Sequence, residues 1–350
     1  MIETPGLEAS IERAIEWGDP IRTPNFRLDD AFGFKEWMHF CISSDDLDLL
    51  VNFSIADDTR PAASADVPLA RLVCVVRTDG WDGDVEQFEA EDVRLRHQGV
   101  HVRCGRNTID YERGVFRVRA ALTHRPVELD LTLRPVALPC LVNDIRLSEG
   151  PPWHWFVAPL LLANGTVTVA GRTMVVRDLP AYHDHNWGHF EWGKDFAWTW
   201  GYGHARDDAE FWSVTFERLT NRARTADRQR GIILWKSARQ QRVFGGGSIA
   251  VHEEGLLRSK RTFKVPRALA LLAQGEATDI PARLWVSARS GDDALELEFR
   301  SRNVCRILVP DDDLGLTIIN EVSGELFMEG TTHGDRVKAR GRATFEFLDA

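Results

Sequence analysis

From residue 37 to the end of the chain, hydrophobic and polar residues mostly alternate in short runs. Alternation with a period of two indicates β-strands buried on one face, and turn residues such as Asp-Gly and Arg-Pro separate the runs. Strands are predicted at residues 37–42, 47–55, 69–78, 100–103, 114–122, 127–133, 167–169, 174–177, 196–204, 211–218, 231–235, 248–252, 283–288, 295–299, 304–309, 317–322 and 344–348.

Two segments show helical spacing instead. Residues 7–17 place Leu7, Ile11 and Ile15 on one face of a helix. Residues 266–274 begin with proline and carry leucines at helical intervals. The sequence therefore predicts few helices beside many strands.

Many short strands with few helices are typical of antiparallel β-barrels or sandwiches. The predicted strands are too many for one small barrel, so we expect an all-β protein of two barrel-like domains. A glycine- and tryptophan-rich stretch near residue 190 joins two strand-rich halves, which gives domains at 1–190 and 191–350. No long flexible linker separates the halves, and we expect them to pack together.

Composition narrows the class of protein. The 350 residues are 43% hydrophobic and 27% charged, and the net charge of −10 argues against nucleic acid as a partner. Residues 1–17 lack the pattern of a signal peptide, and the longest apolar run, 156–163, is too short to cross a bilayer. The five cysteines are scattered, with no CxxC pair. These features predict a soluble, cytoplasmic protein with reduced thiols.

The most unusual segment is residues 181–204, which contains four of the eleven histidines and four of the twelve tryptophans. If its first part is extended, Tyr182, Asp184 and Asn186 share one face, and the residues between them share the other. Asp184 could be a protonated general acid, or a charged group that orients a neighbouring histidine. A structural network that pins the domain junction is the third interpretation.

The second part of this segment, read as a strand, is an aromatic ladder. Its successive members on one face are Phe196, Trp198, Trp200, Tyr202 and His204. The opposite face carries only Ala, Thr and Gly, and would let another strand or backbone approach closely. We expect the aromatic face either to fill a barrel or to line its pocket, where aromatic rings can stabilise a carbocation.

Metal and cofactor motifs are weak. His183 and His185 form an HxH pair that could bind a metal from one strand face, with His189, Glu191 and His204 as further candidates. Their spacing does not match the usual cupin metal motif, so no metal is expected. The sequence contains no GxSxG elbow, Walker loop or Rossmann glycine fingerprint, and no cofactor is predicted.

Basic residues lead into the second predicted helix. They are Arg258, Lys260, Arg261, Lys264 and Arg267. The simpler interpretation is a solvated surface helix. The alternative is a transient contact with a membrane surface, which would help an enzyme to collect a lipid-like substrate.

The sequence AYHDHNWG at 181–188, followed by WTWG at 198–201, resembles the carotenoid 1,2-hydratase (hydroxyneurosporene synthase) and AttH-like group of double lipocalin-like proteins. Trp155, Pro159 and the NGT at 164–166 fit the same resemblance. The resemblance implies two lipocalin- or calycin-like barrels, with a ligand pocket inside one or between the two. Members include hydratases of isoprenoid polyenes, and relatives include natural-product cyclases and Diels–Alderases; none of these needs a cofactor.

The resemblance and the residues together predict a cofactor-independent enzyme, a hydro-lyase or cyclase, that acts on a hydrophobic polyene or isoprenoid-like intermediate of natural-product biosynthesis. Asp184 is the predicted acid, and His183 or His185 would set its protonation and position water. The predicted substrate-binding residues are Tyr182, Asn186, Trp187, Glu191, Trp198, Trp200 and Tyr202.

Two alternatives for the function stay open. A pericyclase of the Diels–Alderase type, an isomerase, would hold its substrate in a reactive fold and use hydrogen-bond donors to tune it. A non-catalytic carrier would bind hydrophobic ligands tightly without turnover. Asp184→Asn separates acid catalysis from substrate folding, because only acid catalysis would lose nearly all activity.

Overall fold

The computed structural model describes residues 5–22, 34–55, 70–96, 99–145, 152–189, 196–257, 262–270, 280–310 and 316–349. The chain divides into two compact units, residues 1–192 and 193–350. Antiparallel sheet dominates each unit, and the α-helices of the described residues are α1 (Pro5–Gly18) and α2 (Arg267–Ala270). The predicted all-β class is confirmed.

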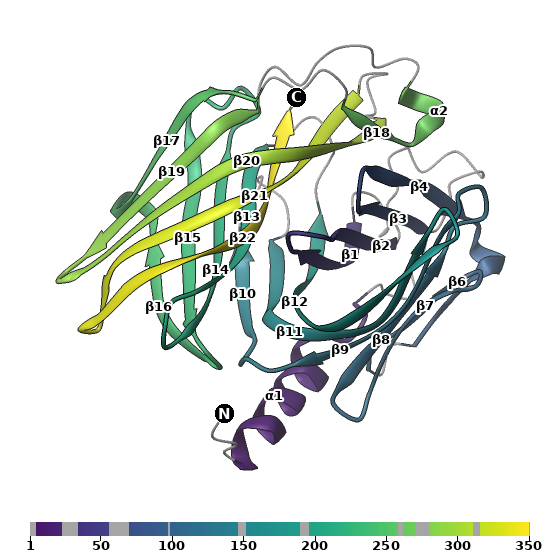
Figure 1. Ribbon diagram of the computed structural model, residues 1–350, viewed down its shortest axis with the longest axis horizontal. Coiled ribbons are helices and arrows are strands. Elements are labelled where there is room, and N and C mark those ends of the chain that lie inside the picture. The colour runs from purple at the N-terminus through teal and green to yellow at the C-terminus, as the bar shows by residue number, and fades with distance from the viewer. Residues whose placement is uncertain are drawn as a thin grey trace. The chain divides into compact units, whose positions relative to one another are not determined.

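The first unit contains one twelve-stranded sheet with the order β4-β3-β2-β1-β12-β11-β9-β8-β7-β6-β5, and β10 pairs with β11. Its strands are β1 (Phe34–Ser43), β2 (Asp48–Ile55), β3 (Ala70–Arg77), β4 (Trp81–Phe88), β5 (Val93–Leu95), β6 (His101–Cys104), β7 (Asn107–Glu112), β8 (Val115–Ala121), β9 (Val127–Pro135), β10 (Cys140–Ile145), β11 (Trp153–Val169) and β12 (Arg172–His189). β3 and β6, near opposite ends of this order, contact each other, so the sheet curves round on itself (Figure 1). Its inward side chains form an apolar core to which α1 contributes Ile11 and Ile15.

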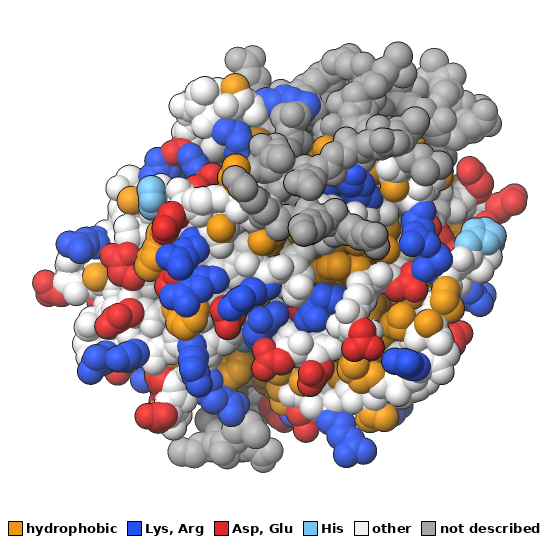
Figure 2. All heavy atoms as spheres, turned by 45° about the horizontal axis from the view of Figure 1, so that its top comes forward, with side chains coloured by type: hydrophobic (Ala, Val, Ile, Leu, Met, Phe, Trp, Pro, Cys, Tyr) orange, Lys and Arg blue, Asp and Glu red, His pale blue; other side chains and the backbone are white. Residues whose placement is uncertain are grey.

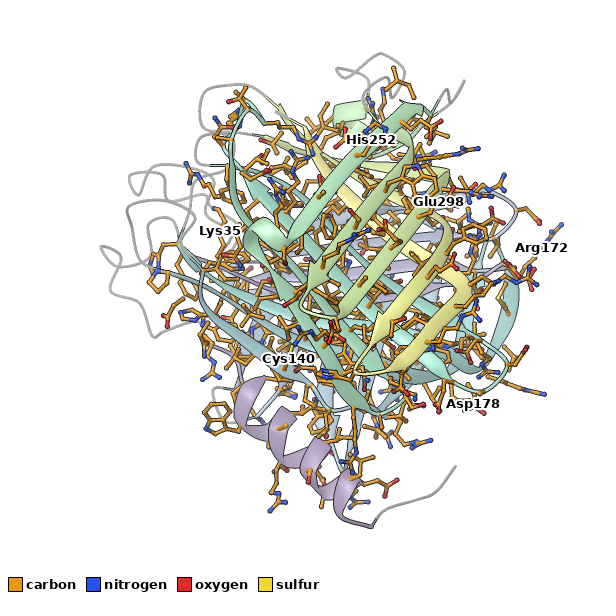
Figure 3. The ribbon with its side chains drawn as sticks, turned by 90° about the vertical axis from the view of Figure 1, so that its left-hand side faces the viewer. Lys35, Cys140, Arg172, Asp178, His252 and Glu298 are labelled. Carbon is orange, nitrogen blue, oxygen red and sulfur yellow. The ribbon has the colours of Figure 1, made fainter. Side chains whose placement is uncertain are left out.

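The second unit contains a ten-stranded sheet with the order β16-β15-β14-β13-β22-β21-β20-β19-β17, and β18 pairs with β20. Its strands are β13 (Ala197–Arg206), β14 (Phe211–Thr220), β15 (Asp227–Lys236), β16 (Arg239–Gly245), β17 (Ile249–Leu256), β18 (Phe263–Val265), β19 (Pro281–Ser290), β20 (Asp293–Pro310), β21 (Leu316–Thr332) and β22 (Asp335–Asp349). Contacts between β16 and β19 bring the ends of this sheet together. His252 of β17 and Glu298 of β20, labelled in Figure 3, lie on this sheet.

The core of the second unit lies on the glycine side of β13, not on its aromatic side. A Cβ on Gly201 would lie 2.6 Å from the Phe345 ring, and a Cβ on Gly203 would lie closer still to the Leu326 side chain. Both of these apolar side chains belong to the buried core cluster of the unit. Of the two alternatives for the aromatic face, filling the barrel is excluded, because Phe345 and its neighbours already fill that space.

The helix predicted at 7–17 is confirmed as α1. The second predicted helix is present as the single turn α2, and residues 271–279 lie outside the described residues, as do Arg258, Lys260 and Arg261. Among the helices that the structure describes, none is long and apolar enough to cross a membrane. On the face shown in Figure 2, Lys and Arg side chains are interspersed with Asp and Glu.

Candidate functional site

β12 carries all three predicted catalytic residues, His183, Asp184 and His185, on two faces of the first sheet. Its register with β1 and β11 places His183 and His185 on the side of the apolar core. Tyr182, Asp184 and Asn186 alternate with them and lie on the other side, where they are also buried. The two faces predicted from the alternation are therefore present in the structure.

The two histidines bind a carboxylate that the sequence analysis did not single out. Asp19, just after α1, is fully buried, and its two oxygens lie 3.1 Å from Nε2 of His183 and 2.9 Å from Nδ1 of His185. Nε2 of His185 donates to Glu36 of β1 at 2.7 Å, and the backbone N–H of Arg22 donates to the same oxygen. This buried chain of ionisable side chains ties the end of α1 to β1 and β12.

Both nitrogens of each ring face acceptor oxygens, because Nδ1 of His183 donates to the carbonyl of His39 at 3.0 Å. Only a doubly protonated ring satisfies such a geometry fully. Burial lowers the pKa of His185, but the hydrogen bonds and charges of Asp19 and Glu36 raise it to about 9. Burial raises the pKa of Asp19, but its charge interactions and hydrogen bonds with the two histidines bring that pKa below its usual value.

All four ring nitrogens of the HxH pair are thus occupied, and a metal could bind there only if this network broke. In the part of the chain that the structure describes, no group of three or more His, Cys, Asp or Glu side chains is arranged to hold a metal ion.

Asp184 has different partners from those we expected. Its Oδ2 accepts hydrogen bonds from the Tyr182 hydroxyl at 3.0 Å and from Nε1 of Trp155 at 3.1 Å, and its Oδ1 accepts one from Nδ2 of Asn186 at 2.8 Å. His183 and His185 point to the opposite face, where their ring nitrogens bind Asp19, Glu36 and the carbonyl of His39. Three converging donors favour Asp184 as a hydrogen-bond acceptor rather than as a proton donor.

Burial, followed by the charge and hydrogen bond of Asp184, raises the pKa of Tyr182 well above its usual value, so this hydroxyl remains a donor. Cys140 of β10, labelled in Figure 3, adds to this effect. Cys41 and His39 of β1 lie on the same face of the sheet as Tyr182 and Asp184, and Sγ of Cys41 is 2.8 Å from Nε2 of His39. Burial and then the charge of His183 lower the pKa of His39 to about 3, so its imidazole is neutral.

Two further predicted substrate-binding residues in this part of the sequence are Trp187 and Glu191. Trp187 lies on the core side, with its ring 4.9 Å from that of His185 and with the Arg22 guanidinium 5.0 Å from its centroid. It packs against the histidine network. Glu191 lies outside the described residues.

The aromatic ladder on β13 is flanked by a row of glutamates on the neighbouring strands of the second sheet. Trp200 of β13 is paired with Glu217 of β14 on one side and with Glu346 of β22 on the other, and Glu346 is paired with Glu321 of β21. Nε1 of Trp198 donates to Glu346. Paired side chains on one face of a sheet lie about 5 Å apart, so carboxyl groups flank the indoles directly.

These carboxyl groups are buried and hold protons readily. Burial raises the pKa of Glu217 to about 7, although a hydrogen bond from Gln229 lowers it in part. Burial also raises the pKa of Glu346, against hydrogen bonds with Glu321 and Trp198 that lower it. A hydrogen bond between two carboxyl groups requires a proton on one of them. At least one carboxyl group of the Glu321–Glu346 pair is therefore protonated, next to the indole of Trp198.

Four carboxyl groups of the site were not predicted from the sequence: Asp19, Glu36, Glu217 and Glu346. Asp19 and Glu36 occur in no motif with the histidines that they bind. Glu217 and Glu346 alternate with apolar residues along their strands. This pattern ordinarily indicates a carboxylate on the solvent-facing side of a strand. The sequence offered a weak signal for Glu217 alone, because its strand directly follows the strand of the aromatic ladder and pairs with it.

The fold is similar to that of several solved structures. The crystal structure of a putative AttH from Nitrosomonas europaea superposes with a TM-score of 0.61 at 14% identity, covering 95% of this chain and 98% of that one. Kievitone hydratase from Nectria haematococca gives a TM-score of 0.58 at 13% identity, covering 90% of this chain and 89% of that one. CghA with Sch210972 gives 0.59 at 13% identity, covering 91% and 89%.

These similarities show that the chain has the fold of the AttH-like proteins, which is the double lipocalin-like fold that the sequence resemblance implied. No protein-family model matches the sequence, and a comparison with curated proteins finds no match.

Proposed function

We propose that the protein is an enzyme that protonates an apolar, unsaturated small molecule at the aromatic ladder, and that Glu217, rather than Asp184, supplies the proton. The observation that carries this proposal is the Glu217 carboxyl group itself. It is buried, its pKa is about 7, and among the described residues only Gln229 hydrogen-bonds to it, through Oε1. Oε2 is therefore available to a substrate.

In the proposed reaction, Oε2 of protonated Glu217 gives its proton to one carbon of an alkene, and the other carbon becomes cationic. The π faces of Trp200 and its neighbours on the ladder, Trp198 and Tyr202, stabilise that charge. Water then attacks the cation and returns a proton to Glu217, which gives an alcohol. Capture by an internal alkene, followed by loss of a proton to Glu217, gives a cyclised isomer instead.

The proposal leaves the β12 residues with supporting roles. Asp184 holds the Tyr182 hydroxyl, the Trp155 indole and the Asn186 amide in fixed positions, and the histidines tie α1 to the first sheet. The fold similarity to kievitone hydratase supports hydration as a reaction for this fold. The sequence resemblance to carotenoid 1,2-hydratases supports the same reaction class and a cofactor-independent mechanism.

The test is isotopic. The purified protein is incubated in D2O with a panel of terpenoid and polyketide-like polyenes, and products are analysed by mass spectrometry and NMR. Acid initiation places one deuterium on carbon in the product, and Glu217→Gln should lower turnover by about a hundredfold or more. Asp184→Asn, a second isosteric variant, should lower it much less. Full activity in Glu217→Gln would contradict the proposal.

A pericyclase is the second candidate, because the aromatic row also presents neutral donors that could hold a substrate in a reactive fold. It would give an isomeric product without deuterium on carbon, and it would tolerate Glu217→Gln. A carrier would bind without forming any product.

A further inference from the structure

Strand β14 carries a line of buried polar groups beside the aromatic ladder. Ser213, Thr215 and Glu217 alternate with core residues and so lie on the ladder side of the sheet. In the register with β13, Thr215 is paired with Tyr202 and Glu217 with Trp200. Ser213 and Thr215 are each 1% exposed, and their hydroxyls have no hydrogen-bond partner among the described residues.

Buried hydroxyl groups normally find partners, and an unpartnered one destabilises a folded protein. Thr220, on the same strand and also 1% exposed, shows the usual arrangement, because its hydroxyl donates to the carbonyl of Ala197 at 3.3 Å. Two adjacent exceptions on one strand face, next to a carboxyl group with a free oxygen, indicate that a bound molecule supplies the missing partners.

We infer that Ser213 and Thr215 form a hydrogen-bonding subsite for oxygen-bearing groups of the substrate, carbonyl or hydroxyl, with one such group at each side chain. The inference rests on the proposed function and adds the substrate class: an oxygen-bearing terpenoid or polyene, not a pure hydrocarbon. Successive same-face residues on a strand are about 7 Å apart. The substrate oxygen bound at Thr215 and the carbon that Glu217 protonates would therefore be separated by several bonds.

The aromatic side of the same surface fits the rest of such a molecule. Tyr202 and Trp200 present an apolar surface along β13, and the hydroxyls run parallel to it along β14. A site with buried donors discriminates strongly against an analogue that lacks the acceptor, because the donors are then left unpartnered. The subsite is therefore a specificity element beside the proposed acid.

The first test uses the ligand-free protein. Thr215→Val removes the unpartnered hydroxyl without changing side-chain size, so the melting temperature should rise. The matched control, Thr220→Val, removes a satisfied hydroxyl of equal burial and should lower it. A fall in melting temperature for Thr215→Val, as in the control, would show that the hydroxyl serves the structure and would overturn the inference.

The second test identifies the ligand class with two probes, the ketone farnesylacetone and the hydrocarbon β-farnesene, by calorimetry. The wild type should bind the ketone more tightly, and Thr215→Val with Ser213→Ala should weaken ketone binding by about tenfold while leaving the hydrocarbon unaffected. Equal binding of the two probes by the wild type, or binding of neither, would refute the oxygen-bearing class.

The outcomes also separate this subsite from the proposed acid. Glu217→Gln should keep the preference for the ketone while losing turnover. If turnover survives in Glu217→Gln and the preference still depends on Thr215, the acid assignment fails and the subsite stands. If turnover is lost in Glu217→Gln but the preference for the ketone is independent of Thr215, the subsite fails and the acid assignment stands.

Discussion

The buried histidine network makes a quantitative prediction about stability against pH. The pKa of His185 is 6.5 in its unperturbed form and about 9 in the folded protein. The increase, 9 minus 6.5, is about 2.5 pH units, which corresponds to about 3 kcal/mol at 1.36 kcal/mol per unit. Because the folded pKa is raised, this stabilisation is fully present below the unfolded pKa and is lost as pH rises through the folded one.

The perturbation is His185→Gln, and the assay is urea unfolding followed by circular dichroism and tryptophan fluorescence between about pH 6 and about pH 10. The difference in unfolding free energy between the wild type and the variant should shrink by about 3 kcal/mol across this range. His252→Gln, an exposed histidine on β17 of the second unit, is the control and should show a constant difference. Parallel pH profiles for the wild type and His185→Gln would refute the assignment of a charged, doubly paired His185.

Two further predictions concern the second unit. Gly201→Ala pushes a methyl group against the Phe345 ring and should lower the free energy of unfolding by about 1–3 kcal/mol in chemical unfolding. The control is Gly247→Ala, where an added Cβ has no atom within 4 Å, and it should have a far smaller effect. Equal effects of the two substitutions would contradict the packing described for β13. Turnover should fall as pH rises through about 7, because Glu217 must be protonated to act as the acid. Gln229→Leu should shift the midpoint of this fall to higher pH, because the hydrogen bond from Gln229 lowers the pKa of Glu217. An unchanged midpoint in Gln229→Leu would mean that another group controls the pH dependence.

The alternation of residues predicted the fold class and the two faces of β12, because strand geometry imposes both locally. It predicted β11 and β12 poorly, since only 167–169 and 174–177 were expected where the structure has Trp153–Val169 and Arg172–His189. Parts of β11 and β12 are buried on both faces, so hydrophobic and polar residues do not alternate there and the strands are hard to recognise in the sequence. Register shifts within the β11–β12 pair add to the difficulty.

The candidate site was predicted only in part, for a related reason. Asp19 is 164 residues from His183, so no local pattern could pair them. Glu217 is an ordinary polar position in an alternating strand, and burial by the folded chain alone gives it an unusual pKa. The aromatic ladder was visible in the sequence, but the side on which the core lies was decided by Phe345 and other distant side chains.

The central claim is that Glu217 is a carboxylic acid that titrates near neutral pH beside the ladder. Infrared difference spectroscopy of the wild type against Glu217→Gln tests it without any substrate. The account predicts a protonated carboxyl C=O band that is present in the wild type under mildly acidic conditions, disappears with a midpoint near the pKa of about 7, and is missing from the variant. Identical carboxyl bands in the two proteins throughout the titration would contradict the account.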